Sequence, residues 1–118
     1  MEDLKKKVLP LIQKALENKK GIDIRIIDIS KISLLADYFV LCSGSNKTQV
    51  RALADYVTDE LAKIGYSPKH TEGYSSAEWI LLDYEDIIIH IFTEESRHFY
   101  DLERIWREGI TVERSELI

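Results

Sequence analysis

Residues 78–93 read EWILLDYEDIIIHIFT, which is two apolar, β-branched segments joined by a Glu-Asp pair. So short a connection predicts an antiparallel hairpin with strands at 78–84 and 86–93. Because side chains alternate between the faces of a strand, a two-residue turn at Glu85 and Asp86 fixes the register. On one face this register pairs Tyr84 with Ile87, Leu82 with Ile89, and Ile80 with Ile91. That face is aliphatic apart from its terminal tyrosine, and we expect it in the core.

The other face of the hairpin is chemically mixed. The same register pairs Asp83 with Ile88, Leu81 with His90, and Trp79 with Phe92. A buried face rarely holds an unpaired carboxylate and imidazole, and a solvated face rarely gathers so much apolar surface. An aromatic patch with polar groups beside it is typical of a protein-binding surface. The alternative is a second layer of helices over this face, with the imidazole as a satisfied core histidine, and both interpretations stay open.

Apolar residues at helical spacing predict three helices around these strands. The first pattern runs through Leu4, Val8, Leu11, Ile12, Ala15 and Leu16, and Pro10 inside it predicts a kink or a helix start. A second amphipathic helix is expected at 48–64, where Asn46 followed by Gln49 fits a capping box. A short C-terminal helix is indicated by Tyr100, Leu102, Ile105 and Trp106.

Further strands are predicted upstream of the hairpin. The β-branched run at 22–29 and the apolar run at 37–43 are both bounded by turn residues, and the polar connection at 66–77 has room for a short edge strand. Strands that alternate with helices predict a single α/β domain with a mixed sheet of about five strands packed with helices. We place this domain at 1–107, followed by a C-terminal tail at 108–118.

Charge is unevenly distributed along the 118 residues. Residues 1–70 contain 12 Lys and Arg against 9 Asp and Glu, whereas residues 71–118 contain 4 against 12. An acidic half repels phosphate backbones and favours a basic protein partner, so we expect little or no direct nucleic-acid contact. No apolar run is long enough to span a bilayer, and the single cysteine, Cys42, is expected as an inert buried thiol in a cytoplasmic protein.

The sequence GSNKT at 44–48 poses the question of nucleotide binding, because glycine-rich turns before helices often cradle phosphate. A Walker-type loop would need a glycine at position 39, which is Phe39. A nucleotidyltransferase would follow Gly44 and Ser45 with two metal-binding carboxylates one residue apart. Asp55 stands at a suitable distance, but the partner position is Val57. The catalytic half of that pattern is missing, and the loop is expected to be scaffold.

Other catalytic patterns are weaker still. His90, Glu94, Glu95 and His98 do not form a compact metal-ligand motif, and the two glutamates suit the first turn of a helix. Ser43 or Ser45 as a nucleophile with His90 lacks the G-x-S-x-G context of a nucleophile elbow. We therefore expect no catalytic residues, no metal and no cofactor, and the protein is predicted not to be an enzyme.

The run EGYSSAEWILLDYEDIIIHIFTEESRHFYDLERIW at 72–106 resembles the Iojap-related ribosomal silencing factor family. The segments DIRIIDI at 23–29 and ADYFVLCSGSNKTQV at 36–50 are similar to its upstream segments, in the same order. The resemblance implies a nucleotidyltransferase-like fold without the catalytic acids. It also implies binding to the large ribosomal subunit through ribosomal protein uL-fourteen, which blocks joining of the small subunit and represses translation.

The resemblance and the mixed face together predict the partner-binding residues. Those that match the family's spacing are Trp79, Asp83, His90, Glu95, Arg97 and Tyr100. We expect Trp79, Leu81, Ile88 and Phe92 to form an apolar anchor, and Asp83, Glu94 and Glu95 to steer a basic partner. His90 would either donate a hydrogen bond across the interface or hold Asp83 in place. The alternative function is a self-associating nucleotidyltransferase-like module with residual nucleotide binding, and a homodimer is possible when the protein is free of the ribosome.

Overall fold

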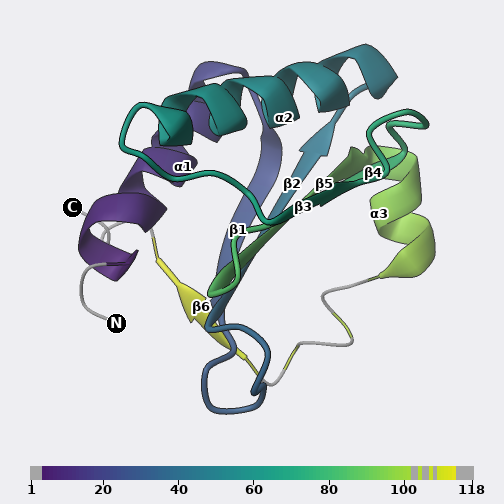
Figure 1. Ribbon diagram of the computed structural model, residues 1–118. Helices are drawn as coiled ribbons and strands as arrows, with labels where there is room; N and C mark the ends of the chain where they lie inside the picture. The colour runs from purple at the N-terminus through teal and green to yellow at the C-terminus, as the bar shows by residue number, and fades with distance from the viewer. Residues whose placement is uncertain (1–3, 102–103, 105–106, 108, 114–118) are drawn as a thin grey trace.

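The computed structural model describes residues 4–101, 104, 107 and 109–113, and it consists of one sheet with two helices packed on one face (Figure 1). Helix α1 spans Leu9–Asn18, preceded by a π-helical turn at Leu4–Val8, and α2 spans Lys47–Ala62. Pro10 lies in the first turn of α1, where a proline is best tolerated, so it marks the predicted start of the α-helix. No helix among the described residues is long and apolar enough to cross a membrane.

The sheet is mixed and has six strands, in the order β3-β4-β5-β2-β1-β6. The strands are β1 (Ile22–Asp28), β2 (Tyr38–Gly44), β3 (His70–Glu72), β4 (Trp79–Asp83), β5 (Ile87–Thr93) and β6 (Ile110–Val112). Only the pairing of β2 with β5 is parallel, because α2 carries the chain back across the sheet between them. The predicted α/β class and mixed sheet are confirmed, and β3 is the expected edge strand.

The hairpin register predicted from the sequence is confirmed at every pair from Trp79 opposite Phe92 to Asp83 opposite Ile88. At the turn, the Tyr84 N–H donates to the Ile87 carbonyl over 2.9 Å. The Asp83 carboxylate accepts from the Glu85 N–H over 2.8 Å. This bond supports the left-handed backbone of Glu85, whose φ is 73°.

The core between the sheet and the helices is built from the face that the register predicted. Ile80, Leu82, Ile89 and Ile91 are at most 1% exposed and pack against the inner stripes of α1 and α2. Each such side chain contributes roughly 1.5–3 kcal/mol when removed from water. Cys42 lies in the same core, and burial raises the pKa of its thiol to about 12. The predicted inert, buried thiol is therefore confirmed.

The GSNKT loop caps α2 and ties it to the end of α1. Asn46 accepts a hydrogen bond from the Gln49 N–H at 2.8 Å, and the Gln49 side chain accepts from the Ser45 N–H at 2.6 Å. The Gln49 amide also donates to the carbonyls of Lys19 and Lys20. The predicted cap at Asn46 is confirmed, although the reciprocal bond of the Gln49 side chain goes to the Ser45 N–H and not to that of Asn46.

The C-terminal part of the chain differs from the sequence prediction. Helix α3 spans Glu94–Tyr100, so Tyr100 ends a helix instead of beginning one, and the expected helical residues Leu102, Ile105 and Trp106 lie outside the described residues. Residues 110–112 fall within the predicted tail, yet they form β6 along the free edge of β1. An edge strand offers unpaired N–H and C=O groups, and the β-branched Ile-Thr-Val sequence suits that position.

Candidate functional site: the aromatic face of the hairpin

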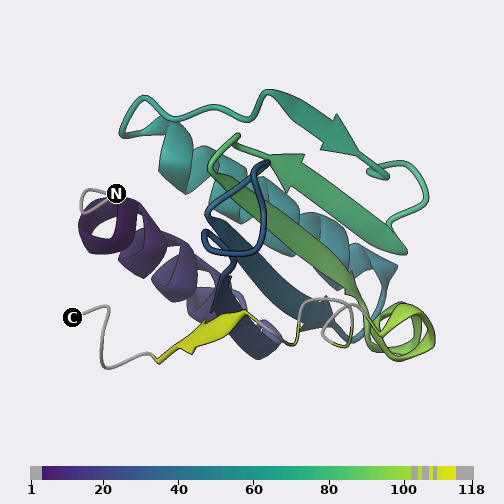
Figure 2. The ribbon, with the colours of Figure 1, turned by 90° about the horizontal axis from the view of Figure 1, so that it is seen from below.

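The side of the sheet opposite α1 and α2 carries the chemically mixed residues of the hairpin. We define the docking face as Trp79, Leu81 and Asp83 of β4 with Ile88, His90 and Phe92 of β5. Helix α3 and the loop between β1 and β2 lie on this side of the sheet, and neither α1 nor α2 covers it (Figures 1 and 2).

Trp79 is the aromatic centre of the docking face. Its side chain is half-buried, and its indole Nε1–H donates to Nδ1 of His90 over 3.0 Å. The ring of Tyr100 on α3 packs against the indole with 4.9 Å between centroids, and Phe92 lies beneath it at 5.9 Å. An indole held on one side by a hydrogen bond and on the other by an aromatic ring loses little freedom when a partner binds.

His90 supports Trp79 from within the sheet. It is 4% exposed, and burial lowers the pKa of its imidazole to about 4, so the ring is neutral near pH 7. Since Nδ1 accepts the indole proton, the ring proton lies on Nε2, and that atom has no hydrogen-bond partner in the described structure. Of the two roles offered for His90, holding Asp83 in place is not the one seen, because the Asp83 carboxylate accepts from the Glu85 N–H at the turn.

The remaining residues of the docking face differ in burial. Leu81, Asp83 and Ile88 are half-buried, whereas Phe92 is fully buried. Phe92 packs with Phe39 and Leu41 of the neighbouring β2 in a second apolar cluster, and Ile88 is a partly buried residue packed against that cluster. Phe92 and His90, which the sequence predicts as partner contacts, are both buried in the structure.

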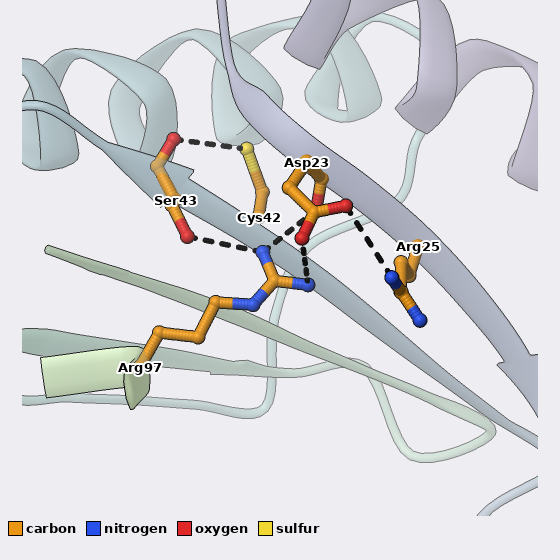
Figure 3. Close-up of polar contacts among 5 residues, drawn as sticks. All are labelled: Asp23, Arg25, Cys42, Ser43 and Arg97. Atoms are coloured by element: carbon orange, nitrogen blue, oxygen red, sulfur yellow. Dashed lines mark hydrogen bonds and ion pairs between the residues drawn. The ribbon is translucent and has the colours of Figure 1, made fainter. Parts of the chain in front are cut away.

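Helix α3 is fixed to the sheet by a buried arginine. Arg97 is 7% exposed, and its Nη1 donates to the Asp23 carbonyl at 2.6 Å and to the Ser43 hydroxyl at 3.0 Å (Figure 3). Its Nη2 lies 3.5 Å from the Asp23 carboxylate, and the guanidinium lies over the Phe92 ring. A buried cation needs such partners to offset its desolvation. In the sequence, Arg97 was singled out only because it matches the family's spacing. In the structure, it holds in place the helix that carries Tyr100.

The outer surface of α3 is polar and acidic at its start. Thr93 caps the helix by accepting from the Ser96 N–H at 3.2 Å. Glu94 and Glu95 occupy the first turn and are exposed, as is Tyr100 at the other end. The helix dipole favours carboxylates in the first turn, which is the structural role expected for Glu94 and Glu95 from the sequence.

Two depressions border the docking face. One, of about 310 Å³, is lined by Glu72, Gly73, Trp79 and Leu81 and is mainly apolar, so it has room for a partner side chain beside the indole. The other, of about 260 Å³, is polar and lies on the other side of α3 beside Arg97. Among the described residues, no group of three or more His, Cys, Asp or Glu is placed to hold a metal ion.

The geometry defines the class of protein: a small α/β domain whose open sheet face carries a fixed, half-exposed indole next to an acidic helix. The sequence matches the family described as "Ribosomal silencing factor during starvation" over residues 2–117. The chain belongs to this family, which confirms the resemblance found in the sequence and makes it a ribosome-associated regulator of translation.

Individual relatives agree with this assignment. The chain is 36% identical over 104 residues to the ribosomal silencing factor RsfS of Bacillus subtilis, covering 88% of each chain. A crystal structure of a protein from Bacillus halodurans has a TM-score of 0.81 and 34% identity, covering 91% of this chain and 97% of that one. The chloroplastic protein Iojap of Zea mays is 24% identical over 102 residues, which cover 86% of this chain and 44% of the maize protein.

Proposed function

We propose that this protein binds the large ribosomal subunit through ribosomal protein uL-fourteen and sterically prevents the small subunit from joining, so that translation is repressed. The observation that carries the proposal is the half-buried indole of Trp79, which is held by His90 and Tyr100 and is partly exposed at the surface of the sheet. Family membership supplies the ribosome as the partner.

The docking face has the composition of an interface centre. Trp79, Leu81 and Ile88 present partly exposed apolar surface, and the adjacent depression of about 310 Å³ offers space for a partner side chain. Tryptophans at the centre of an interface commonly cost about 2 kcal/mol or more when truncated. The apolar contribution to binding should therefore be concentrated at Trp79.

Carboxylates around this centre favour a basic partner. Glu94 and Glu95 are exposed on α3, and Glu78 and Asp83 lie at the two ends of β4. Charges at the rim of an interface mainly accelerate and orient the encounter, and salt screens them over about 8–10 Å. Raising the salt concentration should weaken binding chiefly by slowing association.

The mechanism needs no chemical step. The chain measures 33 × 33 × 26 Å along its principal axes. A body of that size attached to the joining surface of one subunit keeps the opposite surface from approaching, whatever the details of its own contacts. The docking face supplies the affinity, and the bulk of the helical layer supplies the obstruction.

A co-sedimentation experiment tests this function. Purified large subunits are pelleted with the wild type, with Trp79→Ala, and with Tyr56→Ala, which removes a half-buried aromatic ring from α2 on the opposite layer. Trp79→Ala should lose binding while its circular dichroism stays native, and Tyr56→Ala should bind like the wild type. Wild-type occupancy by Trp79→Ala would show that the docking face does not carry the interaction.

The docking face also suits a second copy of the chain when no ribosome is present. A partly exposed indole with apolar neighbours is the kind of surface that self-associates at high concentration. Light scattering after size exclusion should then show a concentration-dependent dimer, which Trp79→Ala abolishes. A protein that stays monomeric up to the highest concentration would remove this second role and leave ribosome binding untouched.

A further inference from the structure

The loop between β1 and β2 turns its apolar side chains into solvent. We call residues 30–35 the leucine loop. Leu34 and Leu35 are 105% and 87% exposed, and Ile32 is 44% exposed. Exposed leucines are common singly, but a cluster of three large aliphatic side chains at the tip of one loop is the kind of patch that marks an interaction site.

Hydrogen bonds within the leucine loop hold its backbone in the conformation that exposes these apolar side chains. The N–H groups of Ile32 and Ser33 donate to the Ile29 carbonyl at 3.0 and 2.9 Å, and the Leu35 N–H donates to the Ser33 hydroxyl at 3.1 Å. At its start, the Ser30 hydroxyl donates to the Asp28 carboxylate at 2.6 Å. The backbone is therefore ordered before any partner arrives, which reduces the entropy lost on binding.

Both ends of the loop are anchored in the apolar cluster beneath the docking face. Ile29 is fully buried and Ala36 is 5% exposed, and both pack with Phe92 in that cluster. The Ile29 N–H donates to the Asp37 carbonyl at 2.8 Å, which closes the loop at its base. The backbone of the loop between β1 and β2 thus starts from a hydrogen-bonded base and lies on the same side of the sheet as α3 (Figures 1 and 2).

The leucine loop and Trp79 lie at opposite ends of that side. Trp79 lies opposite Phe92, near the C-terminal end of β5. The leucine loop lies near the N-terminal end of β5, because Asp37 and Tyr38, which follow the loop, donate their N–H groups to the Asp86 carbonyl. At about 3.3 Å per residue these two ends are roughly 20 Å apart. An interface of standard size, about 800 Å² on each partner, spans that distance.

The charges at the base of the loop identify the kind of partner. Asp28 and Asp37 flank the loop in the chain, and Glu85 and Asp86 form the adjacent hairpin turn, against one lysine in the loop, Lys31. This acidic surround repels phosphate, whether in RNA or in an anionic membrane surface. It attracts a basic protein surface, and the aliphatic tip requires an apolar pocket within that surface.

We propose that the leucine loop is a second contact of the docking surface, in which Leu34 and Leu35 insert into an apolar pocket on a basic protein of the large subunit. This inference rests on the proposed function, because it takes the ribosome as the partner. Trp79 anchors one end of the interface and the leucine loop fixes the other. Two separated contacts also set the orientation of the docked domain, which a single anchor would leave free to rotate.

The test is a double variant, Leu34→Ser with Leu35→Ser, measured by co-sedimentation with purified large subunits. The matched control is Ile64→Ser, which removes an aliphatic side chain that is 53% exposed just beyond α2, on the other layer. The double variant should bind at least about tenfold more weakly with an unchanged melting temperature, because its side chains contribute nothing to the core. The control should match the wild type.

The outcomes separate this inference from the proposed function. If Trp79→Ala loses binding while the double variant binds like the wild type, the docking face stands and the leucine loop has no part in it. If the wild type itself fails to sediment with large subunits, the proposed function fails first.

A photo-crosslinking residue at position 34 gives a second readout that does not depend on a loss of affinity. We expect it to label a basic large-subunit protein. Labelling of ribosomal RNA would overturn the inference. It would also be overturned if vesicles of phosphatidylglycerol and phosphatidylcholine floated the wild type but did not float the double variant.

Discussion

His90 makes the stability of this protein depend on pH in a defined window. Burial lowers the pKa of the folded imidazole to about 4, whereas an unfolded histidine titrates near 6.5. Between these values the unfolded chain binds more protons than the folded one, so stability falls as the pH drops through the window. From pH 7.5 to pH 5 the loss attributable to this one group is about 2 kcal/mol.

The assay is urea denaturation at several pH values, for the wild type and for His90→Phe. Phenylalanine suits the site because Phe39 and Phe92 already pack around the imidazole, with ring centroids 4.7 and 6.5 Å away. The variant leaves the Trp79 N–H without its acceptor at every pH, so this cost is constant. All other titrations are shared and cancel in the difference. The wild type should therefore lose about 2 kcal/mol more than the variant on going from pH 7.5 to pH 5.

A pH-independent difference between the two proteins would refute the reasoning. It would mean that the imidazole is solvated in the folded state, or that it is not the acceptor for the indole. A wild type that gains stability relative to the variant as the pH falls would contradict the sign of the pKa shift. Either result would also remove the physical basis for calling His90 the support of the docking face.

Two further predictions concern the residues that hold the face in shape. Arg97→Met should destabilise the fold by about 3 kcal/mol in urea denaturation, because the buried Ser43 hydroxyl and the partly buried Asp23 carbonyl lose a charged donor. A loss under about 0.5 kcal/mol would show that α3 is held by other contacts. Gly73→Ala should cost about 2–4 kcal/mol, since φ is 79° and a Cβ would collide with the Trp79 carbonyl oxygen. Wild-type stability of that variant would mean that the loop moves freely away from β4.

Short-range rules were sufficient for the hairpin and for the cap of α2. The two-residue turn and the alternation of side chains gave the register of β4 and β5, and both features lie within 16 consecutive residues, 78–93. Asn46 and Gln49 are likewise three residues apart, and their side chains bond locally. In these segments the partner of each group is set by its neighbours in the chain.

Long-range packing decided what the sequence could not. Arg97 bonds to residues 74 and 54 positions earlier in the chain, and nothing in the local pattern indicates either partner. The burial of His90 and Phe92 depends on β2 lying beside β5, a parallel pairing that the hairpin does not imply. Strand β6 was missed because three β-branched residues are too short a run to predict a strand without a free edge beside them.

The central claim, that docking through the aromatic face prevents the subunits from joining, is tested most directly by following subunit association itself. Large subunits are incubated with the wild type or with Trp79→Ala, small subunits are added, and joined ribosomes are separated on a sucrose gradient. The wild type should reduce the joined fraction in proportion to its occupancy, and Trp79→Ala should leave it unchanged. Equal amounts of joined ribosomes in both samples, with the wild type bound to the large subunit, would contradict the account.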